Sequence, residues 1–161
     1  MSEGSKEIII AFYEAFSKGK VDEMVFHYHP EIVFEDPAFG QLKGDEVKAM
    51  WKMLIERSKG NIKITFSDVE IDGDHGSAKW EAAYIFGPEK RKVVNKISAT
   101  LEFKDGKIIR HADHFDVWKW ASQALGWKGW LLGWTPIMRT QIRKQSRGLL
   151  KKYMEKDVSK S

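Results

Sequence analysis

The strongest constraint on the fold is a run of long alternating segments between residues 62 and 117, separated by short turns. From Ser77 to Phe86, alanine and aromatic side chains fall on one face of an extended chain, whereas Lys79 and Glu81 fall on the other. Turn signals of three or four residues bound the segments, at residues 72–74, 87–90 and 104–107. Turns this short join antiparallel strands. The sequence therefore predicts an antiparallel sheet whose last strand runs from Ile108 to Val117.

Helices are predicted before this sheet. Apolar residues recur at helical spacing over Ser5–Ser17, and acidic residues favour a second, short helix over Val21–Tyr28. The run Ile32–Phe34 predicts a strand, and residues 44–46 open a third helix. Helices followed by a run of strands indicate an α+β fold, with the helices packed on one face of a curved antiparallel sheet. We expect residues 1–117 to form this domain.

Residues 118–161 depart from this pattern and are interpreted as a C-terminal extension. Trp118–Leu125 is predicted to be a short helix, and residues 126–136 a glycine-punctuated aromatic loop. A basic amphipathic helix is predicted over Ile137–Met154. Its expected apolar line is Met138, Ile142, Leu149 and Tyr153, and its cations are Arg139, Arg143, Lys144, Arg147, Lys151 and Lys152.

Charge also separates the extension from the body. Residues 1–116 carry 17 Lys and Arg against 21 Asp and Glu, a net charge of −4, whereas residues 117–161 carry 10 against 2, a net charge of +8. Tryptophan beside cations is typical of a segment at an anionic membrane surface. Alternatively, the aromatic loop closes a pocket or builds a dimer, and nucleic-acid binding is not expected because these aromatics lie among leucines. Five of the seven tryptophans lie within 17 residues: Trp118, Trp120, Trp127, Trp130 and Trp134.

The composition excludes several kinds of site. The chain contains no cysteine, so a disulfide, a thiolate nucleophile and a Cys-ligated metal are all excluded. On a strand, His111 and His114 face opposite sides, so a metal site is not expected. No cofactor is expected either. The first residues are polar and no apolar run reaches the length of a membrane span, which predicts a soluble, cytoplasmic protein.

Two short signatures carry a family resemblance: Glu35-Asp36-Pro37 after the first strand, and the hairpin from Leu101 to Ile108 around Gly106. With this order of elements, residues 5–117 resemble the nuclear transport factor 2-like superfamily, and within it the SnoaL-like and ketosteroid isomerase-like branch. The resemblance implies a cone-shaped sheet with helices inside its curve, an enclosed apolar pocket, and a homodimer formed through the sheet's outer face. It implies no single function, because this fold serves isomerases, dehydratases, cyclases, epoxide hydrolases and non-catalytic binding proteins.

The resemblance also gives Asp36 a role. Asp36 falls where ketosteroid isomerases keep the carboxylate that moves a proton at carbon. The hydrogen-bond donors of those enzymes would fall at Phe12 and near Ala99, which cannot donate, and Tyr13 is offset by roughly 100° around the helix. Steroid isomerisation by that route is therefore not expected. Because Asp36 precedes Pro37, satisfying the amides of a turn is its alternative role.

Candidate partners of Asp36 lie on the last strand. Alternation places His111 and Asp113 on one face, and the resemblance turns this face inward. A histidine with a carboxylate two residues away can serve as acid or base, so Asp36, His111 and Asp113 are the predicted catalytic residues. Alternatively, the pair is a structural hydrogen bond, or a register slip of one residue exposes it. The side chains predicted to contact a ligand are Phe12, Tyr13, Trp80, Tyr84, Asn95 and Phe115.

Two functions fit this reading. One is a cofactor-independent acid–base enzyme, of isomerase, dehydratase, cyclase or epoxide hydrolase type, that acts on a small hydrophobic molecule. The other is a non-catalytic protein that binds a lipid-like ligand and docks at a membrane through its basic tryptophan-rich tail. Catalysis is favoured if Asp36, His111 and Asp113 open into one cavity. Binding is favoured if these groups are used up by backbone hydrogen bonds in an otherwise apolar cavity.

Overall fold

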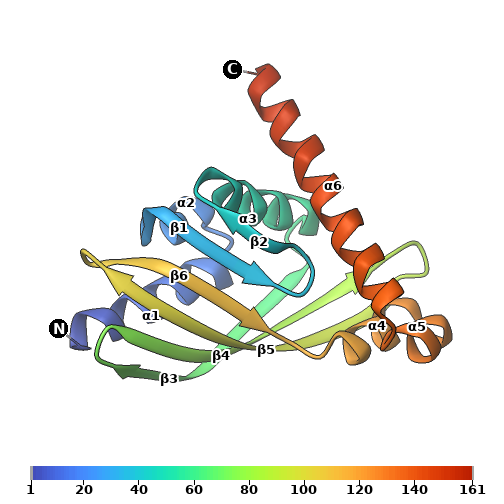
Figure 1. Ribbon diagram of the computed structural model, residues 1–161, viewed down its shortest axis with the longest axis horizontal. Helices are drawn as coiled ribbons and strands as arrows, with labels where there is room; N and C mark the ends of the chain where they lie inside the picture. Colours follow the sequence, from blue (N-terminus) through green and yellow to red (C-terminus); the bar gives the residue numbers. More distant parts are fainter. Residues whose placement is uncertain (1, 161) are drawn as a thin grey trace.

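The computed structural model describes the backbone of residues 2–160 and the side chains of residues 4–157. Helices and two strands share the first 58 residues, four strands follow, and three helices end the described chain (Figure 1). The α+β order predicted from the sequence is confirmed. The elements are α1 (Ser2–Ser17), α2 (Val21–Phe26), β1 (Tyr28–Asp36), β2 (Gly40–Lys43), α3 (Asp45–Ser58), β3 (Ile62–Asp72), β4 (His75–Phe86), β5 (Arg91–Lys104), β6 (Lys107–His114), α4 (Val117–Leu125), α5 (Trp127–Leu132) and α6 (Pro136–Lys160).

The strands form one curved, six-stranded sheet in the order β2-β1-β6-β5-β4-β3 (Figure 1). From β3 to β6, each strand pairs antiparallel with the next through the predicted turns. The opposite edge differs from the prediction, because β1 lies parallel to β6 and the turn around Gly40 contains the additional strand β2. A parallel pair needs a long connection, which α3 and the intervening strands supply. This pairing brings the end of β1 beside the final strand.

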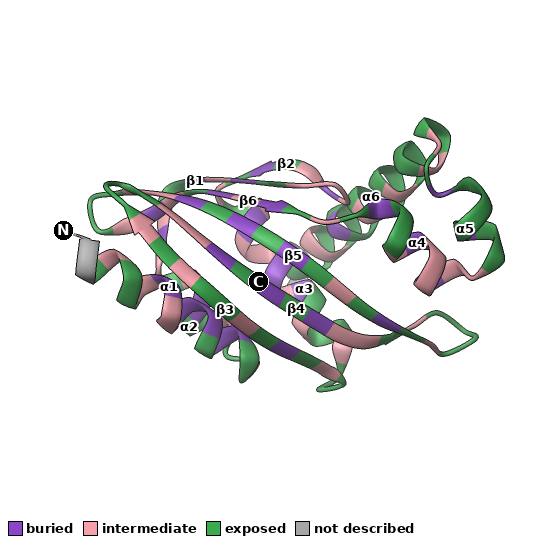
Figure 2. Ribbon diagram, turned by 90° about the horizontal axis from the view of Figure 1, so that it is seen from below, coloured by how far each residue is buried: buried purple, intermediate pink, exposed green. Residues whose placement is uncertain are grey.

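The core lies between the sheet and the helices α1 and α3. Phe16 of α1 contacts both Trp51 of α3 and Trp80 of β4, with ring centroids 5.0 and 5.2 Å apart. Along the strands, buried and exposed residues alternate (Figure 2), as the period of two requires. Gly76 allows α1 to approach β4, because a Cβ atom there would lie 2.7 Å from the Cδ1 atom of Ile9. The cone is therefore densely filled by rings from both layers.

The aromatic loop predicted over residues 126–136 is wrong. Trp127–Leu132 forms helix α5, which packs on α4, and α4 in turn packs on β5. The glycines that suggested a loop permit helix packing instead. A Cβ atom on Gly129 would lie 1.8 Å from the carbonyl oxygen of Ala121, and one on Gly133 would lie 2.9 Å from the Cβ atom of Ala121. Glycine is thus required where α5 touches the backbone of α4.

Helix α6 packs along α3, and its expected apolar line is correct except at one position. Met138, Ile142 and Tyr153 are partly buried, whereas Leu149 is 41% exposed and Leu150 is buried instead. Leu150 lies eight residues after Ile142, which is two steps of four residues, and each such step advances the stripe by about 40° around the helix. Within residues 2–160, no helix is long and apolar enough to cross a bilayer.

Candidate functional site

Five side chains form a buried hydrogen-bond chain inside the cone. The indole nitrogen of Trp51 donates to the Tyr28 hydroxyl over 2.8 Å, and that oxygen lies 2.8 Å from Nδ1 of His111. The other ring nitrogen of His111 lies 3.0 Å from Oδ1 of Asp113, which also accepts the indole N–H of Trp80 over 3.3 Å. His111 and Asp113 are only 1% and 3% exposed. The chain thus carries ionisable groups into the centre of an apolar core.

One tautomer of the histidine satisfies every donor in this chain. The Tyr28 oxygen accepts the indole proton of Trp51, which leaves the Tyr28 hydroxyl proton available to Nδ1 of His111. In that tautomer Nε2 carries the ring proton and donates a hydrogen bond to Asp113. Both nitrogens of His111 are therefore engaged by side chains, so in this arrangement the ring connects Tyr28 to Asp113.

The strand register is as predicted. His111 and Asp113 are buried on the inner face of β6, whereas His114 is exposed on the other face. In the register of β1 with β6, Phe34 is the partner of His111, and Glu35 is the partner of Ala112. The period of two turns Asp36, like Phe34, towards the face that carries His111 and Asp113. The structure therefore brings the three predicted catalytic residues to adjacent strands on one face.

Asp36 ends β1 and is the least buried member of this group. One carboxyl oxygen accepts the backbone N–H of Phe39 over 2.6 Å, so Asp36 does cap the turn after β1. Burial raises the pKa of Asp36 to about 7, and the negative charge of Asp113 acts in the same direction, against the lowering effect of the backbone amides of Phe39 and Ala38. Asp36 thus caps the turn, and its pKa lies in the range that a general base needs near neutral pH, whereas its catalytic role stays a prediction.

Tyr13 has a buried hydroxyl that makes no hydrogen bond to any residue whose side chain is described. Burial first, and the charge of Asp113 second, raise the pKa of Tyr13 well above its usual value, so the phenol is neutral and close to that carboxylate. Phe12 is buried beside it and meets the His111 ring edge-on, with centroids 5.6 Å apart. The 100° offset between Tyr13 and Phe12 does not separate them, because the core covers both sides of α1.

The remaining predicted ligand contacts lie in two places. Trp80 belongs to the buried chain through its indole nitrogen. Tyr84, Asn95 and Phe115 are half-buried, and Trp120 of α4 donates to the Tyr84 hydroxyl over 2.7 Å. Asn95 lies four residues along β5 from Ala99, the register partner of Asp113, which corresponds to about 13 Å of strand. The structure therefore groups Asn95 with the α4 end of the sheet and not with the buried chain.

Two members of the chain were not predicted from the sequence. Tyr28 was assigned to the end of the second helix, and Trp51, which follows the predicted start of the third helix, was not selected as a site residue. Both are buried polar groups, and a buried hydroxyl or indole N–H needs a partner. This rule indicates that Tyr28 and Trp51 have hydrogen-bond partners, but the spacing of residues along the chain does not identify those partners.

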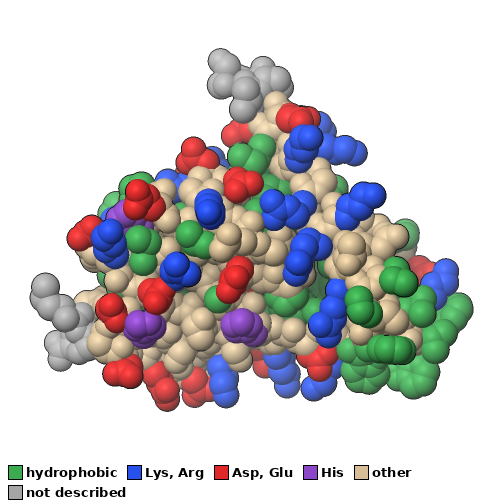
Figure 3. All heavy atoms as spheres, viewed as in Figure 1, with side chains coloured by type: hydrophobic (Ala, Val, Ile, Leu, Met, Phe, Trp, Pro, Cys, Tyr) green, Lys and Arg blue, Asp and Glu red, His purple; other side chains and the backbone are tan. Residues whose placement is uncertain are grey.

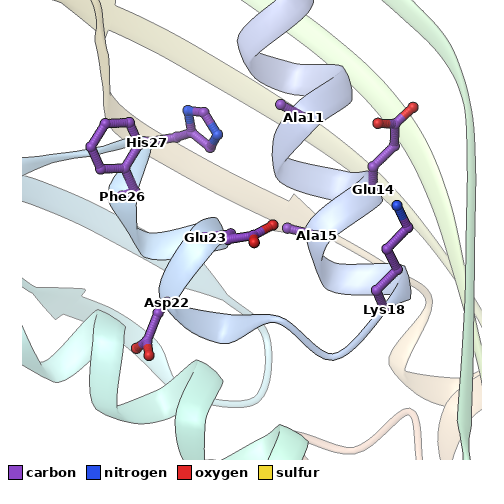
Figure 4. Close-up of a pocket in the computed structure, with 8 residues that line it drawn as sticks. All are labelled: Ala11, Glu14, Ala15, Lys18, Asp22, Glu23, Phe26 and His27. Carbon is purple, nitrogen blue, oxygen red and sulfur yellow. The ribbon is translucent and has the colours of Figure 1, made fainter.

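Among the described residues, two surface depressions stand out, and neither is lined by Asp36, His111 or Asp113. One, of about 440 Å³, lies between α1 and α2 (Figure 4), where Glu14, Lys18 and Glu23 make its wall charged. The other, of about 550 Å³, lies over β3, β4 and β5. Around His111 the nearest space is taken by rings, because the centroids of Phe34 and Trp51 lie 5.2 and 6.2 Å from that of His111. The apolar pocket inside the cone stays a prediction.

A comparison with known protein families shows to which family the chain belongs. The family described as the SnoaL-like domain matches residues 9–111, which is more than half of the chain. The chain belongs to the SnoaL-like family. The resemblance inferred from the sequence is thereby confirmed, and its nuclear transport factor 2-like fold is the observed one. The match ends at His111, so the three C-terminal helices of this SnoaL-like protein lie outside the matched region.

Solved structures share the fold at low sequence identity. Bal32a, from a soil-derived mobile gene cassette, is 20% identical, with a TM-score of 0.68 over 76% of this chain and 98% of its own. A proposed SnoaL-like polyketide cyclase from Jannaschia sp. CCS1 is 12% identical, with a TM-score of 0.67 over 76% and 92%. An LEH-like epoxide hydrolase from M. tuberculosis is 21% identical, with a TM-score of 0.62 over 81% and 94%. Among curated proteins, no match is found.

Proposed function

We propose that this SnoaL-like protein is a cofactor-independent acid–base enzyme that acts on a small hydrophobic molecule. The observation that carries the proposal is the meeting of Asp36, His111 and Asp113 on one inner face, with the Tyr13 hydroxyl close to Asp113 and without a hydrogen-bond partner among the described side chains. The fold shared with a proposed polyketide cyclase and an epoxide hydrolase agrees with this class of chemistry.

The energetic cost of this arrangement supports a functional role. A buried hydroxyl without a hydrogen bond costs about 1–3 kcal/mol, and Tyr13 is such a group. A carboxyl whose pKa is held near 7 is destabilised whenever it ionises, as Asp36 is. Replacement of either group by an apolar residue would remove these costs, so a core selected only for stability has no reason to keep them. Perturbed groups that gather in one place are typical of active sites.

The roles follow from which atoms are free. Asp36 is the proposed general base: its carboxylate removes a proton from a carbon next to a carbonyl, and the electron pair of that C–H bond moves to the carbonyl oxygen. Tyr13 is the proposed donor to that oxygen, because its hydroxyl has no other partner among the side chains that the structure describes. The proton returns from Asp36 to another carbon, so no cofactor is consumed. His111 is engaged at both nitrogens and is therefore assigned to positioning Asp113 near Tyr13.

Substrate would approach from the Asp36 end, which is the least buried part of the group. The turn after Asp36 is held by the extension, since Arg147 of α6 donates to the carbonyl oxygens of Phe39 and Gln41 over 2.7 and 3.1 Å. This end of the cone is closed by side chains and by one helix. Movement of these groups, rather than unfolding of the sheet, would admit a ligand.

The alternative is a non-catalytic protein that binds a lipid-like ligand. One observation favours it: the rings packed around His111 leave its nitrogens bonded within the protein. A histidine in this state stabilises the core and performs no chemistry. The two functions differ in whether a bound molecule exchanges a proton.

Proton exchange provides the test. Cyclohexanone in D₂O reports proton removal next to a carbonyl, and styrene oxide reports epoxide opening; both are followed by NMR with and without the protein. We expect faster exchange or opening of at least one probe, and a loss of about 10²-fold or more in Asp36→Asn. The matched control is Glu35→Gln, which removes the exposed carboxylate next to Asp36 on β1. Equal rates in Asp36→Asn and wild type would refute the assignment of the base. Saturable binding of a probe without conversion would support the alternative.

A further inference from the structure

Six large apolar side chains gather on the surface of α5 and the start of α6. We call this set the aromatic patch. Figure 3 shows hydrophobic side chains collected over α4 and α5 at one end of the molecule, with Lys and Arg side chains along α6 beside them. The patch consists of Trp127, Trp130, Leu131, Leu132, Trp134 and Ile137, which are 71%, 60%, 50%, 46%, 66% and 77% exposed. An exposed apolar cluster of this kind marks an interaction surface.

The packing of α5 on α4 directs the tryptophan side chains of the aromatic patch towards solvent. The Gly129 face of α5 lies against the Ala121 carbonyl, so the tryptophans of α5 occupy the sides that face away from α4. Trp120, by contrast, turns inward and bonds Tyr84. The expectation that the tryptophan-rich segment folds over the mouth of the cone therefore fails for Trp127 and Trp130.

Two indole N–H groups at the patch are satisfied within the protein. The Trp118 indole N–H donates to the Trp130 carbonyl over 2.8 Å, and the Trp134 indole N–H donates to the Leu131 carbonyl over 2.9 Å. Polar groups that are already paired can leave water without losing hydrogen bonds. These two indole groups and the two carbonyls that accept from them can therefore leave water at low cost.

Cations border the patch and are not neutralised by the body. Lys119, Lys128 and Arg139 are exposed, and none of them forms an ion pair with a residue whose side chain is described. The extension carries a net charge of +8, whereas the body carries −4. The occupant of this surface must therefore accept apolar rings and offer negative charge beside them.

We propose that the aromatic patch docks the protein on an anionic phospholipid bilayer. Tryptophan rings favour the boundary between head groups and acyl chains, and cations beside them attract anionic head groups. The patch lies at one end of the long axis of the molecule (Figure 1), where a flat surface can reach it, and its residues line neither described depression. A second copy of the chain fits less well, because it would bring two strongly positive extensions together.

Vesicle binding tests the proposal with the full chain. Phosphatidylcholine vesicles, with and without phosphatidylserine, are mixed with the protein, and binding is measured by co-sedimentation. Insertion is measured by quenching of tryptophan fluorescence with brominated acyl chains. We expect binding only with phosphatidylserine, weakening as salt is added, and quenching of the bound protein. Absence of binding to the anionic vesicles overturns the proposal.

Matched variants separate the patch from general charge. The double variant Trp127→Ser/Trp130→Ser removes two exposed rings, and Lys128→Glu/Arg139→Glu reverses two bordering charges. Each is expected to lower vesicle affinity at least tenfold. The control, Lys79→Glu/Lys96→Glu, makes the same charge change on the exposed face of the sheet and is expected to bind as wild type. Equal binding by wild type and the ring variant, or an equal loss in the control, overturns the proposal.

Two further measurements complete the test. Circular dichroism checks that each variant is folded, and light scattering without lipid reports self-association. A dimer that is lost in Trp127→Ser/Trp130→Ser, together with no vesicle binding, identifies a second copy as the occupant and overturns the proposal. The same ring variant is expected to keep wild-type rates on cyclohexanone and styrene oxide without lipid. Failure of docking and failure of the proposed catalysis are therefore distinguishable.

Discussion

Replacing Asp36 by asparagine removes a buried charge but keeps an oxygen that can accept the Phe39 N–H. In the folded protein the pKa of Asp36 is raised from 3.8 to about 7, chiefly by burial. Below about pH 4 the carboxyl is neutral in both the folded and the unfolded chain, so it does not lower the free energy of unfolding there. As the pH rises from about 4 to 7, the unfolded chain ionises while the folded protein keeps the proton, and the free energy of unfolding falls.

The size of this effect follows from the pKa. A rise from 3.8 to about 7 corresponds to up to about 4 kcal/mol of destabilisation, complete above pH 7. The asparagine of Asp36→Asn cannot ionise. The free energy of unfolding of this variant should therefore equal that of the wild type near pH 4 and exceed it by up to about 4 kcal/mol at pH 8. Urea unfolding, followed by tryptophan fluorescence at both pH values, measures the difference. The Glu35→Gln variant controls for loss of an exposed carboxylate. If Asp36→Asn gains no stability over wild type between pH 4 and pH 8, the carboxyl is not held near pKa 7 and the reasoning fails.

The remaining predictions concern activity and packing. The rate of cyclohexanone exchange should rise with pH and level off above about 7, because Asp36 must be ionised to accept a proton; a pH–rate profile that falls across this range contradicts this role. Tyr13→Phe should keep or increase the free energy of unfolding while lowering activity at least tenfold, because it removes a buried hydroxyl that bonds to none of the described residues. Tyr28→Phe should instead lower the free energy of unfolding, measured in urea, by about 1–3 kcal/mol, since it leaves the buried nitrogens of His111 and Trp51 without this partner. Gly129→Ala should lower the melting temperature, because its Cβ would meet a backbone carbonyl at 1.8 Å, whereas Gly148→Ala, with open space around it on α6, should stabilise by up to about 1 kcal/mol. Equal melting temperatures for these two variants would contradict the packing of α5.

The sheet could be predicted from the sequence because its signals are local. The alternation over Ser77–Phe86 and the three short turns determine which strands pair and in what order. The same period of two places His111 and Asp113 on one face of the last strand, and the family resemblance identified that face as the inner one. Elements whose faces and ends are encoded within a few residues were predicted well.

The surroundings of the site could not be predicted, because they depend on contacts between distant segments. Tyr28 meets His111 across 83 residues, and Trp51 meets Tyr28 across 23. Spacing along the chain does not show which indole reaches which hydroxyl, nor how completely rings fill a curved sheet. The α5 helix was missed for a related reason. Gly129 disfavours a helix locally, and only its contact with Ala121 explains why it is there.

The backbone contact between α5 and α4 also limits how the protein can behave in water. Because no space remains between Gly129 and Ala121, α5 cannot roll about its own axis to bring Trp127 or Trp130 inside. As long as α5 stays packed on α4, both rings therefore remain exposed to solvent. Whatever decides when they are covered must act from outside, through lipid composition, salt or a competing molecule.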